Sequence, residues 1–127
     1  MRTYHPDILP INIAIIREEE IGSNPDLKSF TDTEGNPLRA SKGALGWVLK
    51  ALRHTESYTV NYSVICFCER PTVNTITHEA FHAACDWLGQ LGIDFDNNCA
   101  NEIYAYVIGY ISGCINDAIS KDKIWND

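Results

Sequence analysis

Three residues in the second half of the chain have the types and the spacing of a zinc centre. His78 and His82 are four positions apart, so on a helix they lie one turn from each other and both imidazoles can reach one metal ion. Glu79, between them, can hold and deprotonate a zinc-bound water. Two histidines, one further carboxylate ligand and one open water position define a catalytic rather than a structural zinc site.

The third protein ligand is predicted to be a carboxylate that lies further along the chain. Glu102, twenty positions after His82, is preferred as a ligand on a later helix. Asp86, one turn beyond His82, is the reserve. Two other aspartates lie in the loop that is predicted to follow: Asp94 and Asp96.

The HEAFH segment resembles the HExxH motif of the zincin metallopeptidases. Residues 101–105, Asn-Glu-Ile-Tyr-Ala, resemble the second motif of the gluzincins, in which a glutamate on the next helix is the third ligand. The metzincin class is excluded, because Cys85 and Leu88 occupy the positions of its glycine and its third histidine. Residues 78–113 also resemble small phage- or prophage-encoded HExxH proteins of unknown function.

This resemblance implies a minimal, single-lobe zinc metallopeptidase that hydrolyses peptide bonds. His78, His82 and Glu102 would bind Zn²⁺, and the general base would be Glu79. A full gluzincin has a second lobe with a Tyr or His that stabilises the oxyanion, and 127 residues leave no room for it. Tyr106 is the favoured substitute because it shares a helix face with Glu102. The other candidates are Tyr104, Tyr110 and His54.

Two other classes of function remain open. In the first, zinc has no catalytic role and only joins two helices. In the second, the chain is a metal-free phage structural or interaction protein. The sequence is compatible with a homo-oligomer and does not require one. If the chain is a peptidase, its peptide or protein substrate is expected to lie extended along an edge strand, with residues 58–68 as the favoured strand.

The composition argues against two kinds of partner. The net charge is −7 and no basic cluster occurs, so no nucleic-acid partner is expected. No apolar run approaches the roughly 20 residues that span a bilayer, and the first residues lack the pattern of a signal peptide. Five cysteines without a C-x-x-C pair are typical of reduced thiols. We therefore expect a cytoplasmic location, in the bacterial host if the chain is phage-encoded.

Hydrophobic patterning predicts strands in the first half of the chain. Residues 8–17 form an apolar, β-branched run typical of a buried strand, and the acidic run 18–20 is expected to be its solvated end. Residues 44–52 fit either a helix or a strand, and we favour a strand that forms a hairpin with the alternating run 58–68. Residues 18–43 are rich in turn formers and predict a long loop, with a short helix around 26–30.

Two helices are predicted in the second half. The first begins near Thr75 or Thr77 and ends at Gly92, and the second spans residues 101–120. The apolar face of the second helix is predicted to contain Tyr104, Val107, Ile108, Ile111 and Ile115. On the first helix the core face is expected to contain Phe81, Ala84, Leu88 and Leu91, and the metal face to contain Cys85 beside the histidines.

Glycines are predicted to mark a close crossing of the two helices. Gly109 and Gly113 share the helix face of Glu102, and Gly89 lies on the histidine face of the first helix. Together these elements predict a single α+β domain, 1–127, in which a small, mostly antiparallel sheet packs on two C-terminal helices. Residues 1–70 would form its strand-and-loop half, and residues 71–127 its metal-binding half.

Overall fold

Strands and helices occupy different parts of the chain in the computed structural model, which describes residues 1–7, 10–41, 43–95 and 100–122. Two compact units, residues 1–69 and 70–127, divide the chain where the sequence predicted the change from strands to helices. The first unit contains the strands and the second contains two helices. The predicted α+β class, with a mostly antiparallel sheet and two C-terminal helices, is confirmed.

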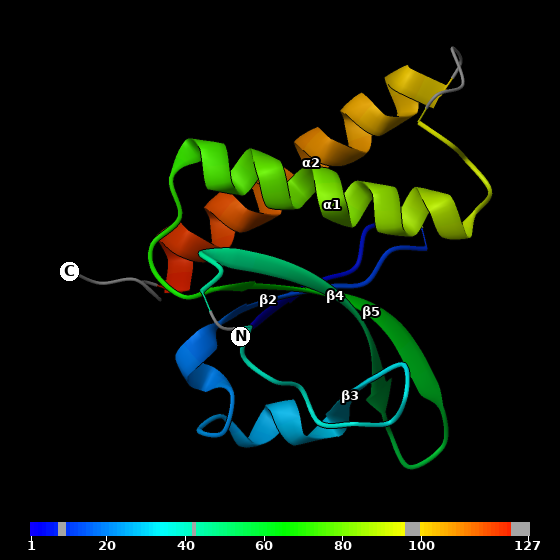
Figure 1. The fold of residues 1–127 in the computed structure, drawn as a ribbon. Coiled ribbons are helices and arrows are strands. Elements are labelled where there is room, and N and C mark those ends of the chain that lie inside the picture. The colour runs from blue at the N-terminus through cyan, green and yellow to red at the C-terminus, as the bar shows by residue number, and fades with distance from the viewer. Residues whose placement is uncertain (8–9, 42, 96–99, 123–127) are drawn as a thin grey trace. The chain divides into compact units, whose positions relative to one another are not determined.

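One five-stranded sheet organises the first unit (Figure 1). Its strands are β1 (Arg2–Tyr4), β2 (Ile13–Arg17), β3 (Phe30–Asp32), β4 (Gly46–His54) and β5 (Thr59–Phe67). The order across the sheet is β1-β2-β5-β4-β3, and every neighbouring pair is antiparallel except β2 and β5. The prediction that residues 58–68 form an edge strand is wrong, because β5 lies between two strands: β4 pairs with it over residues 59–67 and β2 over residues 63–67.

The hairpin of β4 and β5 confirms the choice of strand over helix for residues 44–52. Gly46 lies opposite Phe67 and His54 opposite Thr59, so the register is continuous over both strands. The turn between them is closed by the backbone N–H of Thr55, which donates to the carbonyl of Tyr58 at 2.9 Å. The N–H of Tyr58 donates in return to the Thr55 hydroxyl at 3.1 Å. Pairing with β5 therefore decides an ambiguous local pattern.

The strand predicted over residues 8–17 is shorter in the structure. It begins at Ile13, and residues 8 and 9 lie outside the described residues. The strand β1 was missed, because its three half-buried residues have no alternating pattern. Both faces of β2 are buried, as its continuous apolar run indicated: Ile13, Ala14, Ile15 and Ile16 are fully buried.

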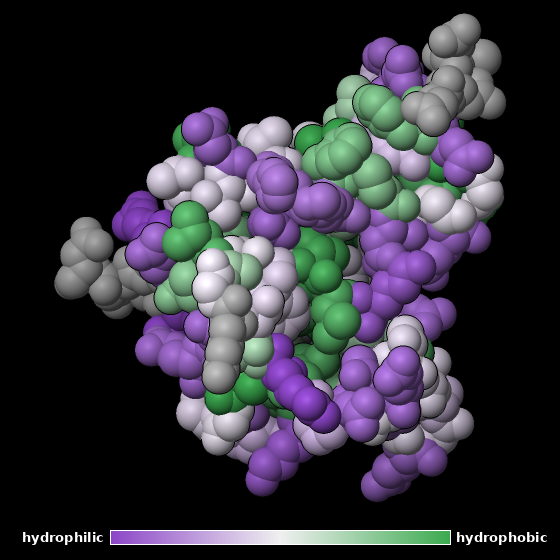
Figure 2. Space-filling view, viewed as in Figure 1, coloured by the Kyte–Doolittle hydropathy of each residue, from purple (hydrophilic) through white to green (hydrophobic). Residues whose placement is uncertain are grey.

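The connection between β2 and β4 contains the two short 3₁₀ helices η1 (Glu18–Glu20) and η2 (Pro25–Ser29), followed by β3. The Asn24 side chain starts η2 by accepting from the N–H of Asp26 at 3.0 Å, and Pro25 occupies its first position. This element corresponds to the short helix expected around residues 26–30. Hydrophilic residues (purple) cover much of the face in Figure 2, and apolar residues (green) show between them in several places.

The sequence suggested that the acidic run 18–20 is a solvated strand end, and the structure differs from this at Glu20. Glu20 is buried, and its carboxylate accepts from the N-terminal ammonium at 2.5 Å and from the backbone N–H of Arg17 at 2.8 Å. The Asn24 amide donates to it at 3.0 Å. Burial raises the pKa of Glu20, but these hydrogen bonds outweigh it and hold the pKa below its ordinary value.

In the second unit, α1 (Val73–Gln90) and α2 (Ala100–Asp122) contact and cross each other (Figure 1). The apolar face predicted for α2 is mostly buried: Tyr104, Val107, Ile111 and Ile115 are buried, and Ile108 is half-buried. On α1, Ala84 and Leu88 are buried as predicted. Leu91 is 48% exposed because the helix has ended at Gln90, and Trp87 takes a buried place that the sequence did not indicate.

Candidate metal centre

The helix α1 holds the motif in uninterrupted helical backbone. It begins at Val73, earlier than predicted, because the Thr72 side chain caps it by accepting from the N–H of Thr75 at 3.3 Å. At its other end Gly92 has a φ of 76°, and the N–H of Ile93 donates to the carbonyl of Leu88 at 2.9 Å. This is the glycine C-terminal motif that the sequence predicted.

The structure brings His78 and His82 together as the spacing predicted. Their Nε2 atoms are 3.0 Å apart, and the ring centroids are 4.6 Å apart with the planes at 79°. Two imidazoles on one tetrahedral zinc, with Zn–N bonds of about 2.0–2.1 Å, have nitrogens about 3.3 Å apart. Both side chains are exposed. The pair therefore fits two zinc ligands with a shift of a few tenths of an ångström.

Glu79 lies on the buried side of α1, with only 5% of the residue exposed. One carboxylate oxygen is 3.9 Å from Nε2 of His78, which places the carboxylate beside the histidine pair. Burial raises the pKa of Glu79, and the neighbouring charges of His78 and His82 act in the opposite direction without cancelling the rise. A carboxylate with a raised pKa beside a metal position is suited to the role of a general base.

The carboxylates predicted as third ligand do not complete this centre. Glu102 is exposed near the start of α2, and Asp86 is half-buried on α1. Among the described residues, no three His, Cys, Asp or Glu side chains lie close enough together to hold one metal ion. The roles of Glu102 and Asp86 therefore stay predictions from spacing. Asp94 is exposed, and Asp96 lies outside the described residues.

Cys85 has the half-buried position expected of a residue that packs beside the histidines. Its thiol is free, and burial raises its pKa. A thiol with a raised pKa is a poor metal ligand at neutral pH, because the thiolate is the form that binds.

The candidate oxyanion residues differ in what they already bond. Tyr104 is buried, and its hydroxyl donates to the carbonyl of Ile93 at 2.7 Å, so that hydroxyl is committed to the fold. His54 lies in the strand unit and interacts with the Thr31 hydroxyl at 2.8 Å. Tyr106 is 74% exposed on α2, and Tyr110 is 39% exposed. The role of Tyr106 in stabilising the oxyanion stays a prediction.

The predicted glycine-mediated crossing of the helices is wrong. A methyl group built on Gly89, Gly109 or Gly113 would meet no atom within 4 Å. Gly109 and Gly113 are exposed, and the buried side of α2 belongs to larger residues such as Ile111 and Cys114. The buried side of α2 is thus made of larger side chains, and the glycines face open space.

Comparison with protein-family models, with curated protein sequences and with solved structures found no match to the chain. Neither helix in the described part of the chain combines the length and the apolar composition needed to cross a bilayer.

Proposed function

We propose that this chain is a zinc-dependent hydrolase of the HExxH type, with peptide bonds as the substrate class to be tested first. One observation carries the proposal: the Nε2 atoms of His78 and His82 face each other at 3.0 Å, with the buried Glu79 carboxylate 3.9 Å from the first of them. A metal-binding pair and a base on one helix are two of the parts that metal-assisted hydrolysis uses, beside a third ligand.

The chain's own residues would divide the work as follows. His78 and His82 hold the ion from the exposed side of α1. Zinc held there would supply a water of pKa about 7 and would polarise the substrate carbonyl. Glu79 accepts a proton from the attacking water and delivers it to the leaving amine. Its raised pKa favours this role, because a weaker acid is a stronger base.

The proposal keeps Glu102 as third ligand and Tyr106 as oxyanion donor on the strength of sequence spacing. An extended peptide has no free edge along residues 63–67 of β5, which pair on both sides, and the sheet ends in β1 and β3, each of three residues. The net charge of −7 gives no support for a nucleic-acid substrate. We place the activity in the cytoplasm, where the four described cysteines would stay free.

A second candidate function is non-catalytic zinc binding. The described residues supply two histidines and no third ligand, and such a pair can hold zinc together with a group from a partner protein. The remaining alternative is a phage structural or interaction protein that binds no metal.

Zinc content decides first between these functions. We would measure it by mass spectrometry on untagged protein purified without chelator, with His82→Ala as the test variant and His54→Ala as the matched control. About one zinc per chain in the wild type and in His54→Ala, lost in His82→Ala, supports the site. A wild type that contains no zinc and takes none up would remove both zinc functions.

The variant Glu79→Gln then separates the enzyme from the non-catalytic site. A hydrolase keeps its zinc and loses cleavage of fluorescein-labelled casein, because only the base is missing. Non-catalytic zinc binding gives no cleavage in either protein.

A further inference from the structure

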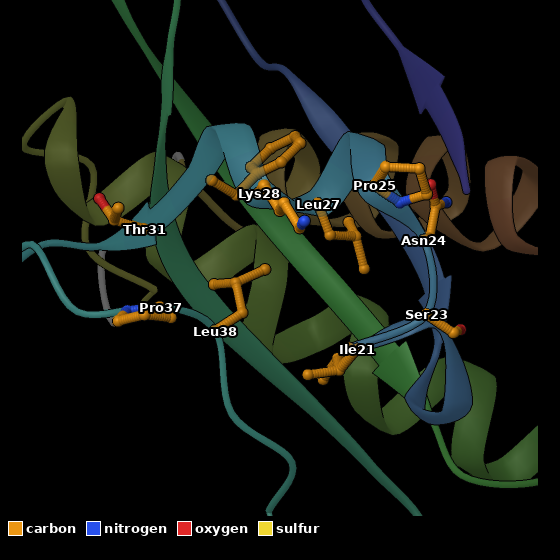
Figure 3. A pocket seen from close by; sticks show the side chains of 11 residues that line it. Ile21, Ser23, Asn24, Pro25, Leu27, Lys28, Thr31, Pro37 and Leu38 are labelled. Carbon is orange, nitrogen blue, oxygen red and sulfur yellow. The ribbon is translucent and has the colours of Figure 1, made fainter.

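A hollow of about 540 Å³ opens on the surface of the 1–69 unit and contains no residue of the zinc motif (Figure 3). Its size falls in the range of small-molecule sites, about 300–1,000 Å³. The turn between η1 and η2, the helix η2, the start of β3 and the returning segment 37–38 form its walls. The side chains that line it include Ile21, Ser23, Asn24, Leu27, Lys28 and Leu38.

The floor of the hollow is part of the apolar core of the strand unit. Leu27, Phe30 and Leu38 are at most 7% exposed and belong to the same hydrophobic cluster as Val64 of β5. Ile21 packs against this cluster and is half-buried. An apolar group that enters the hollow therefore leaves water for a surface that is already part of the packed interior.

The polar wall residues have bonds within the fold. The Ser23 hydroxyl donates to the carbonyl of Glu19 at 2.7 Å. The Asn24 side chain donates to the Glu20 carboxylate at 3.0 Å and accepts a backbone N–H with its oxygen. The Thr31 hydroxyl donates to the next carbonyl at 3.0 Å. These residues shape the wall and offer a ligand little further hydrogen bonding.

Lys28 is the one ionisable residue among those that line the hollow. It is exposed, and its amine has no hydrogen bond or ion pair with any residue that the structure describes. Figure 3 shows it projecting from η2 on the side that borders the hollow. A single cation without a partner, next to an apolar floor, matches a ligand that has one anionic group on an apolar body.

We propose that this hollow binds a small amphipathic monocarboxylate, with its apolar body on Leu27 and Leu38 and its carboxylate at the Lys28 amine. The rim is held before any ligand arrives, since the N–H groups of Ser23 and Asn24 donate to the carbonyl of Glu20 at 3.1 and 2.9 Å. A preformed rim keeps the ordering cost of binding low.

Octanoate, titrated into the full-length, isotope-labelled protein and followed by NMR, tests the proposal. Saturable shifts of the Ile21, Leu27 and Leu38 methyl signals are expected. Lys28→Gln should weaken octanoate by about fivefold, the factor that an exposed ion pair of close to 1 kcal/mol gives. Lys50→Gln, the same charge change elsewhere in the unit, should leave the affinity unchanged.

Octan-1-ol separates the role of charge from that of the apolar floor. It has an alkyl chain of similar length without the carboxylate, so it should bind more weakly than octanoate. Its affinity should be the same for Lys28→Gln and the wild type. Absence of saturable shifts at millimolar octanoate would overturn the proposal. So would shifts spread over the whole surface, or equal octanoate affinity for Lys28→Gln and the wild type.

Discussion

The Nε2 atoms of His78 and His82 lie 3.0 Å apart on the exposed side of α1. At that distance one ring can donate an N–H to the other only while at least one imidazole is neutral. A divalent ion can take the place of the shared proton and bind both nitrogens.

Zinc should stabilise the folded protein through this pair. At a free zinc concentration 100 times the dissociation constant, binding to the folded state alone adds about 2.7 kcal/mol to the free energy of unfolding. His78→Ala and His82→Ala should each abolish the zinc-dependent rise in melting temperature, and His54→Ala should keep it. A rise that survives in both site variants would place the bound zinc elsewhere.

Glu102→Gln tests the third ligand, which sequence spacing predicts and the structure does not bring to the pair. We expect it to weaken zinc at least about tenfold, since even the loss of an outer partner of a ligand costs that much. Asp86→Asn should change zinc affinity little. Competition with a zinc-binding dye measures both variants, and the opposite ranking would make Asp86 the ligand.

Glu79→Gln should stabilise the metal-free protein at neutral pH. Because burial raises the pKa of Glu79 in the folded state, the stability linked to its protonated form is present below the ordinary pKa and is lost as the pH rises through the raised value. A glutamine stays neutral at every pH. We expect a melting temperature a few degrees higher at pH 7 and unchanged at pH 4, with the exposed Glu34→Gln as control.

Glu20 should contribute in the opposite sense. Its pKa is lowered in the folded state, so its contribution is present above its ordinary pKa near 4.5 and is lost as the pH falls through the lowered value. Glu20→Gln should cost about 2 kcal/mol at pH 7, the range for hydrogen bonds to a charged group. Denaturant titrations at pH 7 and pH 3 should show most of this difference disappearing in acid.

Alanine at the helix glycines should be stabilising. Gly109 and Gly113 lie within α2 and have open space where a methyl group would go, so each substitution should add about 0.5–1 kcal/mol. Gly92→Ala is the matched opposite, because its φ of 76° disfavours a side chain. Thermal unfolding ranks the stabilities of the three variants. If Gly109→Ala and Gly113→Ala prove destabilising, the two helices do approach closely at these glycines.

Local patterns identified the elements that depend on local rules. The alternating pattern over residues 58–68 predicted the strand β5. The helical spacing of Tyr104, Val107 and Ile111 predicted the buried face of α2. What the sequence did not reveal depends on distant partners. The strand β1 exists through its pairing with β2, and the central place of β5 follows from its parallel pairing with β2.

At the candidate metal site, too, local spacing predicted some features and distant contacts decided others. The meeting of His78 and His82 needs only helical geometry, and spacing predicted it. The burial of Glu79 and the exposed position of Glu102 depend on which sides of α1 and α2 are covered in the folded chain. Five consecutive residues are enough to bring the two histidines together, whereas tertiary packing decides which of the two carboxylates is buried.

The parallel pairing of β2 with β5 also bears on how quickly this chain folds. Ile13 meets Ser63 only after the intervening chain, with η1, η2, β3 and β4, has been enclosed in one large loop. Closing such a loop costs entropy before the contact is rewarded, whereas the β4–β5 hairpin and α1 can form from neighbouring residues. We therefore expect the hairpin to form early and β2 to dock late, with the docking of β2 limiting the rate of refolding.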